Sequence, residues 1–133
     1  MFSEAETSYL KSQRVARVAT TSARGNPEVS PVGFEFDGEY FWIGSHSQDI
    51  FHTTRRYRNI TSGSSRVSLV VDDLASVEPW RPRGIKVSGT AQVMKHKGIF
   101  GEGDYFRIRP SVSVSWGIEP PKDGKWNSRK KWD

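Results

Sequence analysis

The feature that most constrains the fold of this chain is an alternation of apolar and polar residues with a period of two. It is clearest in residues 84–94, GIKVSGTAQVM, and it recurs in residues 27–36, PEVSPVGFEF, and 111–118, SVSVSWGI. Successive side chains of a β-strand point to opposite faces, so this period is typical of strands that bury one face. The chain is therefore expected to be mainly β.

Further strands are expected at RVARVATTS, EYFWIGS, RVSLVV and DYFRIRP, so that the chain has about six strands in all. Strands this numerous in so short a chain usually close into a small barrel. Asp37-Gly38 predicts a two-residue hairpin turn, because such a turn needs positive φ at both positions. Residues 72–83 contain two prolines and are interpreted as a connector.

Two helices are expected. Ser3 and Glu6 form a capping box, which predicts a short helix that ends near Arg14. The interior helix is expected over residues 47–59, with Ser47 as its cap. Residues 1–119 would then form one barrel domain. Residues 120–133, PPKDGKWNSRKKWD, would form a basic polar tail that is flexible on its own.

The charge of the chain is localised. The net charge is +5, to which the tail contributes +3 and residues 51–66 contribute +4, so the remainder carries −2. This pattern favours a local anion site over a basic face that follows a duplex, and nucleic-acid binding is not expected. The hydrophobic content of 35% predicts a modest core, and we expect some apolar surface to be buried in a homodimer.

Several classes of chemistry find no support. The chain has no cysteine, so it has no disulfide and no thiolate nucleophile or ligand. His46, His52 and His96 lack the spacing of metal ligands, so no metal site is expected. Motifs of hydrolases, P-loops and Rossmann folds are missing, and no residue stands out as catalytic. No apolar run resembles a signal peptide or a membrane span, which predicts a cytoplasmic protein without membrane contact.

Arg55, Arg56 and Arg58 crowd four positions, and no acidic residue lies within residues 51–66. Cations in the last turn favour the negative end of a helix, which would account for any single one of them. At helical spacing, however, the three cannot share one solvated face, and guanidiniums this close repel unless an anion lies among them. Phosphate matches the guanidinium fork and is the anion we expect.

The aromatic residues give a second indication. Most of them, such as Phe34 and Trp42, are interpreted as core residues, but Trp80 lies beside Arg81 in a connector. A flat ring ligand with a phosphate would use such a pair.

These segments, in this order, resemble the pyridoxamine 5′-phosphate oxidase-like split β-barrel proteins. The resemblance covers about residues 3–119, and it is carried by RVARVATTSARGNPEVSPVGFEFDGEYFWIGSH, RRYRNI, RVSLVVDD, PWRPRGIKVSGTAQV and IRPSVSVSWGIE. PWRPRG and SWG make the chain most similar to the coenzyme F420-dependent subgroup, which includes reductases of tetracycline biosynthesis. The resemblance implies a mainly β, six-stranded split β-barrel of the flavin-reductase, FMN-binding type with short helices.

The resemblance also implies a homodimer with two cofactor sites at the subunit interface, for coenzyme F420 or alternatively FMN. In this family the basic residues of the helix after the third strand hold the cofactor phosphate, which points to Arg56 and Arg58, with Arg55 and Asn59 nearby. The other implied cofactor-binding residues are Ser30, Pro31, Val32 and Gly33 along the ring, Gly44, Ser45 and His46 beside the phosphate, and Trp80, Arg81 or Trp116 from the other subunit.

The expected function is that of an F420-dependent oxidoreductase, which transfers a hydride to a small unsaturated organic substrate with solvent or Tyr57 as the proton donor. An FMN-binding flavoprotein of the same family is the alternative. A non-catalytic barrel that carries a cofactor, or that binds haem through His46, His52 or His96, is a rival from another class. A second rival is a nucleic-acid-binding barrel that uses KWNSRKKW.

Overall fold

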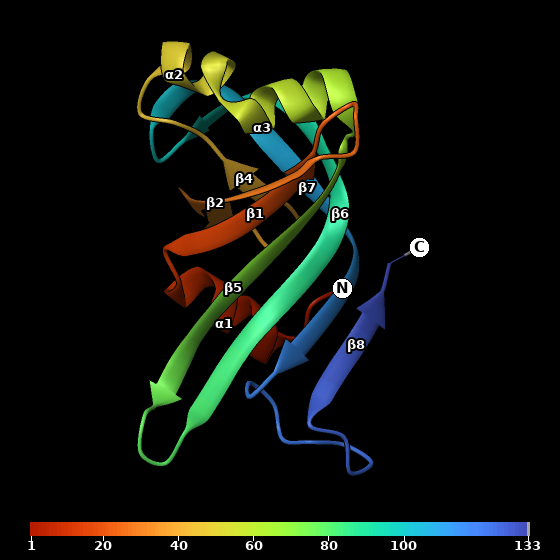
Figure 1. Cartoon of the computed structure of the whole chain (residues 1–133). Coiled ribbons are helices and arrows are strands. Elements are labelled where there is room, and N and C mark those ends of the chain that lie inside the picture. Colours follow the sequence, from red (N-terminus) through yellow and green to blue (C-terminus); the bar gives the residue numbers. More distant parts are fainter. Residues whose placement is uncertain (133) are drawn as a thin grey trace.

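The computed structural model describes residues 1–132, and most of them lie in β-strands (Figure 1). Within these residues, no helix is both long and apolar enough to cross a membrane. The elements in chain order are α1 (Glu4–Ser12), β1 (Val15–Thr21), β2 (Pro27–Gly33), β3 (Glu35–Phe36), β4 (Phe41–Ile43), α2 (Gln48–Thr53), α3 (Arg55–Arg58), the π-helix η1 (Asn59–Gly63), β5 (Arg66–Ser76), β6 (Arg81–Gly98), β7 (Gly101–Trp116) and β8 (Asn127–Lys131).

The strands form one antiparallel sheet in the order β2-β1-β5-β6-β7-β4-β3, with β8 added to β7. Only Phe34 separates β2 from β3, so the two ends of this order are neighbours in the chain and the sheet curls back on itself. The fold is thus the expected mainly β split barrel with short helices. The helices α2 and α3 cover one end of it (Figure 1).

The period-two alternation marks the core as expected. In β6, the side chains of Ile85 and Val87 are at most 1% exposed, whereas those of Lys86 and Ser88 face solvent. Burial of apolar surface of this kind stabilises the folded chain by about 25 cal/mol per Å² of area removed from water. The resulting core fixes the register of the strands, because a slip of one residue would turn its apolar side chains to solvent.

Residues 104–110 and 111–118 were expected as two strands, but they belong mostly to one strand, β7. This strand pairs with β6 along its whole length through a register shift in which Ser88 faces Val112 and Gly89 faces Pro110. Ser111 is therefore an extra residue, and Pro110 lies at the irregularity, where its missing N–H is tolerated. The bulge bends the strand without ending it.

The turns differ from expectation at two places. β5 continues to Ser76 and β6 starts at Arg81, so the connector expected over residues 72–83 is largely the two arms of a long hairpin (Figure 1). The loop between β3 and β4 has four residues instead of two. Gly38 has the positive φ of 102°, while the Asp37 carboxylate accepts from backbone N–H groups and so closes a wider turn.

The expectation of a flexible tail is wrong for residues 127–131, which form β8. β8 pairs with the C-terminal half of β7, along the edge that β4 leaves open. Lys130 also forms an ion pair with Glu6 of α1, whose side chain is fully buried. A free sheet edge and a buried carboxylate each need a partner, and β8 supplies both.

The capping box of α1 is confirmed. The Ser3 hydroxyl accepts from the N–H of Glu6 at 3.1 Å, and the Glu6 carboxylate accepts from the N–H of Ser3 at 2.9 Å. The helix buries Tyr9 and Leu10, and it ends at Ser12.

Candidate functional site

The helix expected over residues 47–59 is broken in two. Thr54 has extended backbone, with φ −70° and ψ 154°, between α2 and α3. Its hydroxyl accepts from the N–H of Tyr57 at 3.2 Å, which caps α3, and donates to the carbonyl of Phe51 at 3.1 Å. Threonine side chains compete in this way with the regular backbone ladder. Phe51 is 1% exposed and holds α2 on the core, so the three arginines belong to a separate short helix.

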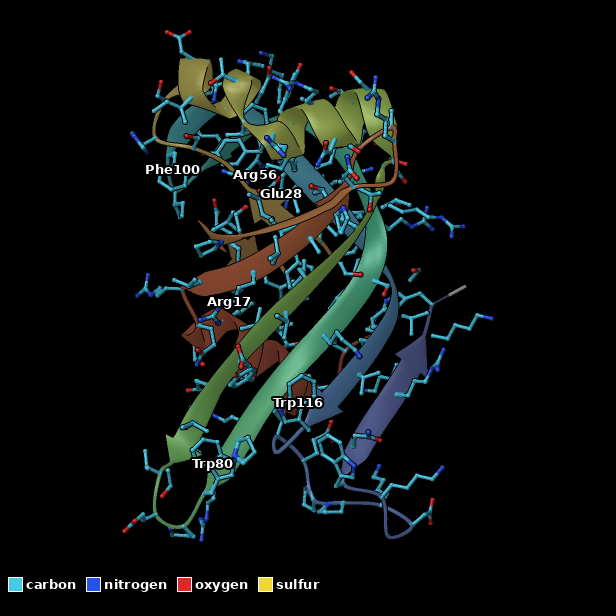
Figure 2. The ribbon with its side chains drawn as sticks, viewed as in Figure 1. Arg17, Glu28, Arg56, Trp80, Phe100 and Trp116 are labelled. Carbon is cyan, nitrogen blue, oxygen red and sulfur yellow. The ribbon has the colours of Figure 1, made fainter. Side chains whose placement is uncertain are left out.

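Arg56 is the arginine of α3 that turns towards the barrel (Figure 2). Its Nη1 donates to the hydroxyl of Ser30 on β2 at 3.4 Å, whereas Arg55 and Arg58 are exposed. The Nε of Arg56 is buried and has no hydrogen-bond partner among the described residues. Burial lowers the pKa of its guanidinium, and the carboxylate of Glu28 opposes this shift. Arg56 is thus a half-buried cation with a donor that lacks an acceptor.

Glu28 is a site residue that the sequence analysis missed. It lies on β2, two positions before Ser30, so both side chains are on the same face of the strand. Its Oε2 is buried without a partner in the described part of the chain. Glu28 and Arg56 lie close beneath α3, yet they are not joined by an ion pair (Figure 2). The period of two in residues 27–36 was the signal that could have placed Glu28 beside Ser30.

Asn59 holds the arginine segment to the barrel. Its side chain is 3% exposed, and its Nδ2 donates to the hydroxyl of Thr20 on β1 at 2.9 Å. Close packing continues at Gly63, where a Cβ atom would lie 2.7 Å from the carbonyl oxygen of Thr21. Asn59 therefore has a structural contact, and it fixes the position of the arginines that precede it.

The strand residues expected along the ring have different environments. Ser30 contacts Arg56, Pro31 is exposed, and Val32 is buried in the core, so only the backbone of Val32 is available to a ligand. β2 pairs with β1 alone, which leaves alternate backbone groups on its other edge without a strand partner. Gly33, at the end of β2, lies near the ring of Phe100, a partly exposed aromatic residue that the sequence analysis also missed.

Gly44, Ser45 and His46 connect β4 to α2. A Cβ atom at Gly44 would lie 2.4 Å from the ring of Tyr105, so the backbone runs against that ring and admits no side chain. The Ser45 hydroxyl accepts from the N–H of Ser47 at 3.4 Å, and His46 is exposed. This loop lies at the end of the barrel that carries α2 and α3, but within residues 1–132 no hydrogen bond joins it to Arg56.

Trp80 and Trp116 lie far from Arg56 in the same chain (Figure 2), and Arg81 follows Trp80 directly in the sequence. Trp80 is 67% exposed in the turn of the β5–β6 hairpin, and Arg81 begins β6. Trp116 ends β7 with its ring against Gly84, where a Cβ atom would lie 2.6 Å away. One chain therefore does not bring all the expected cofactor residues together.

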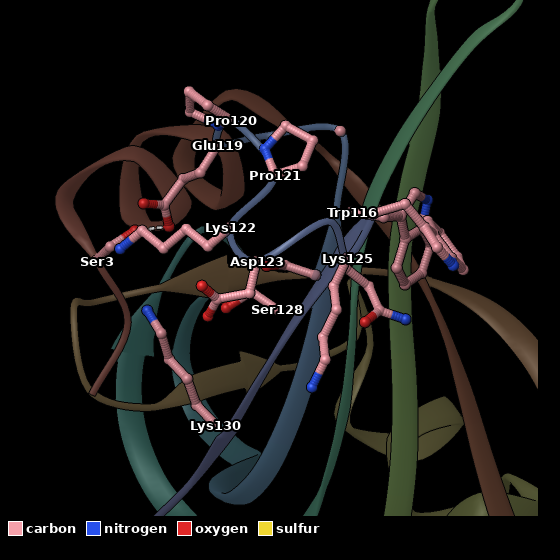
Figure 3. A pocket seen from close by; sticks show the side chains of 14 residues that line it. Ser3, Trp116, Glu119, Pro120, Pro121, Lys122, Asp123, Lys125, Ser128 and Lys130 are labelled. Atoms are coloured by element: carbon pink, nitrogen blue, oxygen red, sulfur yellow. Dashed lines mark hydrogen bonds between the residues drawn. The ribbon is translucent and has the colours of Figure 1, made fainter.

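Trp116 also lines a pocket of about 300 Å³ between the end of β7 and the C-terminal segment (Figure 3). The ring centroids of Trp126 and Trp116 are 6.4 Å apart, and the hydroxyl of Ser3 donates to the carboxylate of Glu119 at 2.6 Å. Both aromatic and charged groups therefore line the pocket, which lies at the opposite end of the barrel from Arg56.

Two of the three histidines are engaged in contacts within the chain. His52 has the carbonyl oxygen of Gln48 at 2.6 Å from Nδ1 and a carboxylate oxygen of Asp104 at 2.8 Å from Nε2. His96 stacks on Trp42 with ring centroids 3.8 Å apart. His46 is exposed in the loop before α2.

Comparisons with known proteins give one family match and one clear relative. The family model described as pyridoxamine 5′-phosphate oxidase matches residues 2–126. The 5a,11a-dehydrotetracycline/5a,11a-dehydrooxytetracycline reductase of Streptomyces rimosus is 34% identical over 122 residues, which cover 89% of this chain and 84% of the relative.

Solved structures share the fold at lower identity. A structure described as an F420 reductase has a TM-score of 0.62 and 18% identity, and the match covers 84% of this chain and 98% of that one. HutZ, a haem storage protein of Vibrio cholerae, has a TM-score of 0.59 and 16% identity, with coverage of 84% and 92%. These two likenesses show the common barrel alone.

Proposed function

The chain belongs to the pyridoxamine 5′-phosphate oxidase family, and from this premise we propose that it is an oxidoreductase that binds a flavin or deazaflavin through its phosphate. The observation that carries the proposal is the buried, unpartnered Nε of Arg56 beside the edge strand β2. The relative from Streptomyces rimosus supports the assignment because it is named a reductase.

The residues present fit such a cofactor. A phosphate oxygen would supply the acceptor that Arg56 Nε lacks, and charge-assisted hydrogen bonds of this kind are among the stronger ones in proteins. Arg55 and Arg58 are exposed on the same short helix and would add to the local positive potential. The unpaired backbone edge of β2 would meet polar atoms along one edge of a flat ring.

Between the two cofactors we propose coenzyme F420, with FMN as the alternative. The choice is consistent with the description of one protein of this fold as an F420 reductase and with the 34% identity to a reductase of dehydrotetracyclines. The deazaflavin, when bound, supplies the hydride chemistry. The substrate would be a small organic molecule with a reducible double bond.

In this mechanism the chain binds the cofactor, orients it and shields it from water. Arg56 would fix one end of the cofactor, and β2 would fix the ring so that one face meets the substrate. The ring of Tyr57 packs at the edge of the core, with its centroid 5.6 Å from that of Phe51 and 5.1 Å from that of His52. We therefore propose solvent as the proton donor.

The proposed site is completed by a second copy of the chain. Trp80 and Trp116 lie too far from Arg56 to reach the same cofactor, and Trp80 is largely exposed. An antiparallel arrangement of two barrels would bring these residues of one protomer to the arginine end of its partner. The cofactor would then lie at the interface of the homodimer.

The proposal is tested by titrating the purified protein separately with coenzyme F420 and FMN and following their fluorescence. We expect micromolar or tighter binding of the deazaflavin. Oxidation of the reduced deazaflavin by a simple α,β-unsaturated ketone, followed by absorbance, then tests the reductase activity. Absence of binding by both cofactors at high micromolar concentration would contradict the proposal.

A further inference from the structure

The carboxylate of Glu28 is out of place in a site built only to attract anions. It lies on the same face of β2 as Ser30 and close to the guanidinium of Arg56, but the two charges are not joined by an ion pair. Each side chain keeps one buried polar atom without a partner in the described residues, Oε2 in Glu28 and Nε in Arg56. An anion bound by Arg56 would therefore have a negative neighbour.

The two candidate cofactors differ in the charge of their phosphate. The phosphate of FMN is a monoester, which carries about −1.5 to −2 charges at pH 7. The phosphate of coenzyme F420 is a diester between the ribityl chain and a further acyl chain, and it carries a single negative charge. A carboxylate beside the site repels the monoester more strongly than the diester, since the repulsion scales with the charge of the phosphate group next to it.

Resting on the proposed function, we propose that Glu28 makes the Arg56 site selective for a phosphodiester such as that of coenzyme F420 over a phosphomonoester such as that of FMN. Specificity of this kind comes from a repulsive element next to an attractive one. Arg56 provides the attraction that both cofactors share. Glu28 provides the repulsion, which is stronger for FMN than for coenzyme F420.

Glu28 has a second effect that fits the same ligand. Its unpartnered Oε2 can accept a hydrogen bond but cannot donate one when ionised. The ribityl chain next to the phosphate carries hydroxyl donors in both cofactors. A hydrogen bond from such a hydroxyl would lower the free-energy cost of the buried carboxylate oxygen equally in the complexes with coenzyme F420 and FMN. The discrimination by phosphate charge is therefore unchanged.

The test compares the affinity of coenzyme F420 and FMN for the native protein and for Glu28→Gln, which keeps the shape and removes the charge. We expect the ratio of the two dissociation constants to shift by about tenfold in favour of FMN. Glu39→Gln is the matched control, because Glu39 is exposed in the β3–β4 loop and its carboxylate forms no hydrogen bond or ion pair within residues 1–132. The control should keep the native ratio.

The outcomes separate this inference from the proposed function. If Glu28 only positioned Arg56, Glu28→Gln would change both affinities by the same factor, and the inference would be overturned. An unchanged ratio in a variant that keeps the native melting temperature would also overturn it. If the native protein bound neither cofactor, the proposed function itself would fail. Should Glu28→Gln unfold, Glu28→Ala replaces it. The ratio should then shift in favour of FMN in the same way, and an unchanged ratio would overturn the inference.

Discussion

The guanidinium of Arg56 donates to the hydroxyl of Ser30 across 3.4 Å, and this contact joins the short helix α3 to the edge strand β2. The two residues are 26 positions apart in the sequence. Their contact brings a half-buried cation to a strand whose outer backbone edge is open, and we propose that these two features hold the phosphate and the ring of the cofactor. The proposed cofactor site depends on this pair.

The three arginines of α3 should not contribute equally. Arg56→Ala should weaken cofactor binding by about tenfold to a hundredfold, because it removes a desolvated charged donor. Arg55→Ala should weaken it by about threefold at most, since an exposed charge is screened by solvent. Fluorescence titration of the two variants measures this. Equal losses would show that the site uses general positive charge and not one guanidinium.

Thr54 should control both local stability and the site. Thr54→Ala removes the cap of α3 and should lower the free energy of unfolding by about 1 kcal/mol. It should also weaken cofactor binding several-fold, because α3 carries Arg56. Thr53→Ala is the control, since in the described part of the chain the Thr53 hydroxyl donates only to the carbonyl of Ile50 within α2. Urea unfolding and titration of both variants would contradict the account if Thr53→Ala had the larger effect on binding.

The C-terminal strand should stabilise the barrel through one ion pair. Lys130→Met leaves the fully buried Glu6 carboxylate without its cation and should lower the free energy of unfolding by about 3 kcal/mol. Burial raises the pKa of Glu6, but hydrogen bonds from Lys130 and Ser3 outweigh it and hold the pKa below its usual value. Adding Glu6→Gln to Lys130→Met should restore part of the loss.

Lys131→Met is the matched control for that experiment, because Lys131 is the exposed neighbour in the same strand. Its unfolding in urea should match that of the native protein. A similar loss in both lysine variants would mean that the strand pairing, and not the buried carboxylate, is what Lys130 supports.

Stability should fall on acidification partly through Asp73. The bidentate contact with Arg83, at 2.7 and 2.9 Å, holds the pKa of Asp73 below its usual value. A carboxyl whose pKa is depressed by folding contributes stability above its unfolded pKa of about 4, and this is lost as pH falls through the folded pKa. The pH dependence of urea unfolding should therefore be less steep on the acid side in Asp73→Asn than in the native protein.

Asp72→Asn serves as the comparison for Asp73→Asn. Asp72 pairs with Arg17, but both side chains are about half exposed, and exposed pairs contribute little. On the acid side, the free energy of unfolding of Asp72→Asn should fall with decreasing pH as steeply as that of the native protein. A less steep fall in Asp72→Asn than in Asp73→Asn would contradict the assignment.

Much of the barrel could be predicted because the alternation in residues such as 84–94 reflects a buried core directly. The break at Thr54 could not be predicted, because the sequence of residues 47–59 suits a continuous helix and only the packing of Phe51 favours two short ones. β8 was missed because its residues are polar. It is specified by the free edge of β7 and by the buried Glu6, which are properties of the folded chain.

The candidate site was predicted in part. The resemblance and the charge pattern singled out Arg56 and Ser30, and the structure brings these two together. The resemblance pointed to Arg56 and Arg58 alike. The sequence could not distinguish these two, because their exposure depends on how α3 lies on the barrel. Glu28 was overlooked because acids were sought among residues 51–66, whereas the strand opposite supplies one.

The most direct test of the central claim is a comparison of coenzyme F420 with the same deazaflavin whose ribityl chain ends in a hydroxyl instead of a phosphate. Both ligands are titrated into the native protein, Arg56→Ala and Arg129→Ala, an exposed arginine of β8 that serves as control. If Arg56 holds the phosphate, its removal weakens binding of the coenzyme and leaves binding of the phosphate-free form nearly unchanged. If Arg56→Ala weakens both ligands alike, or neither, the claim is contradicted.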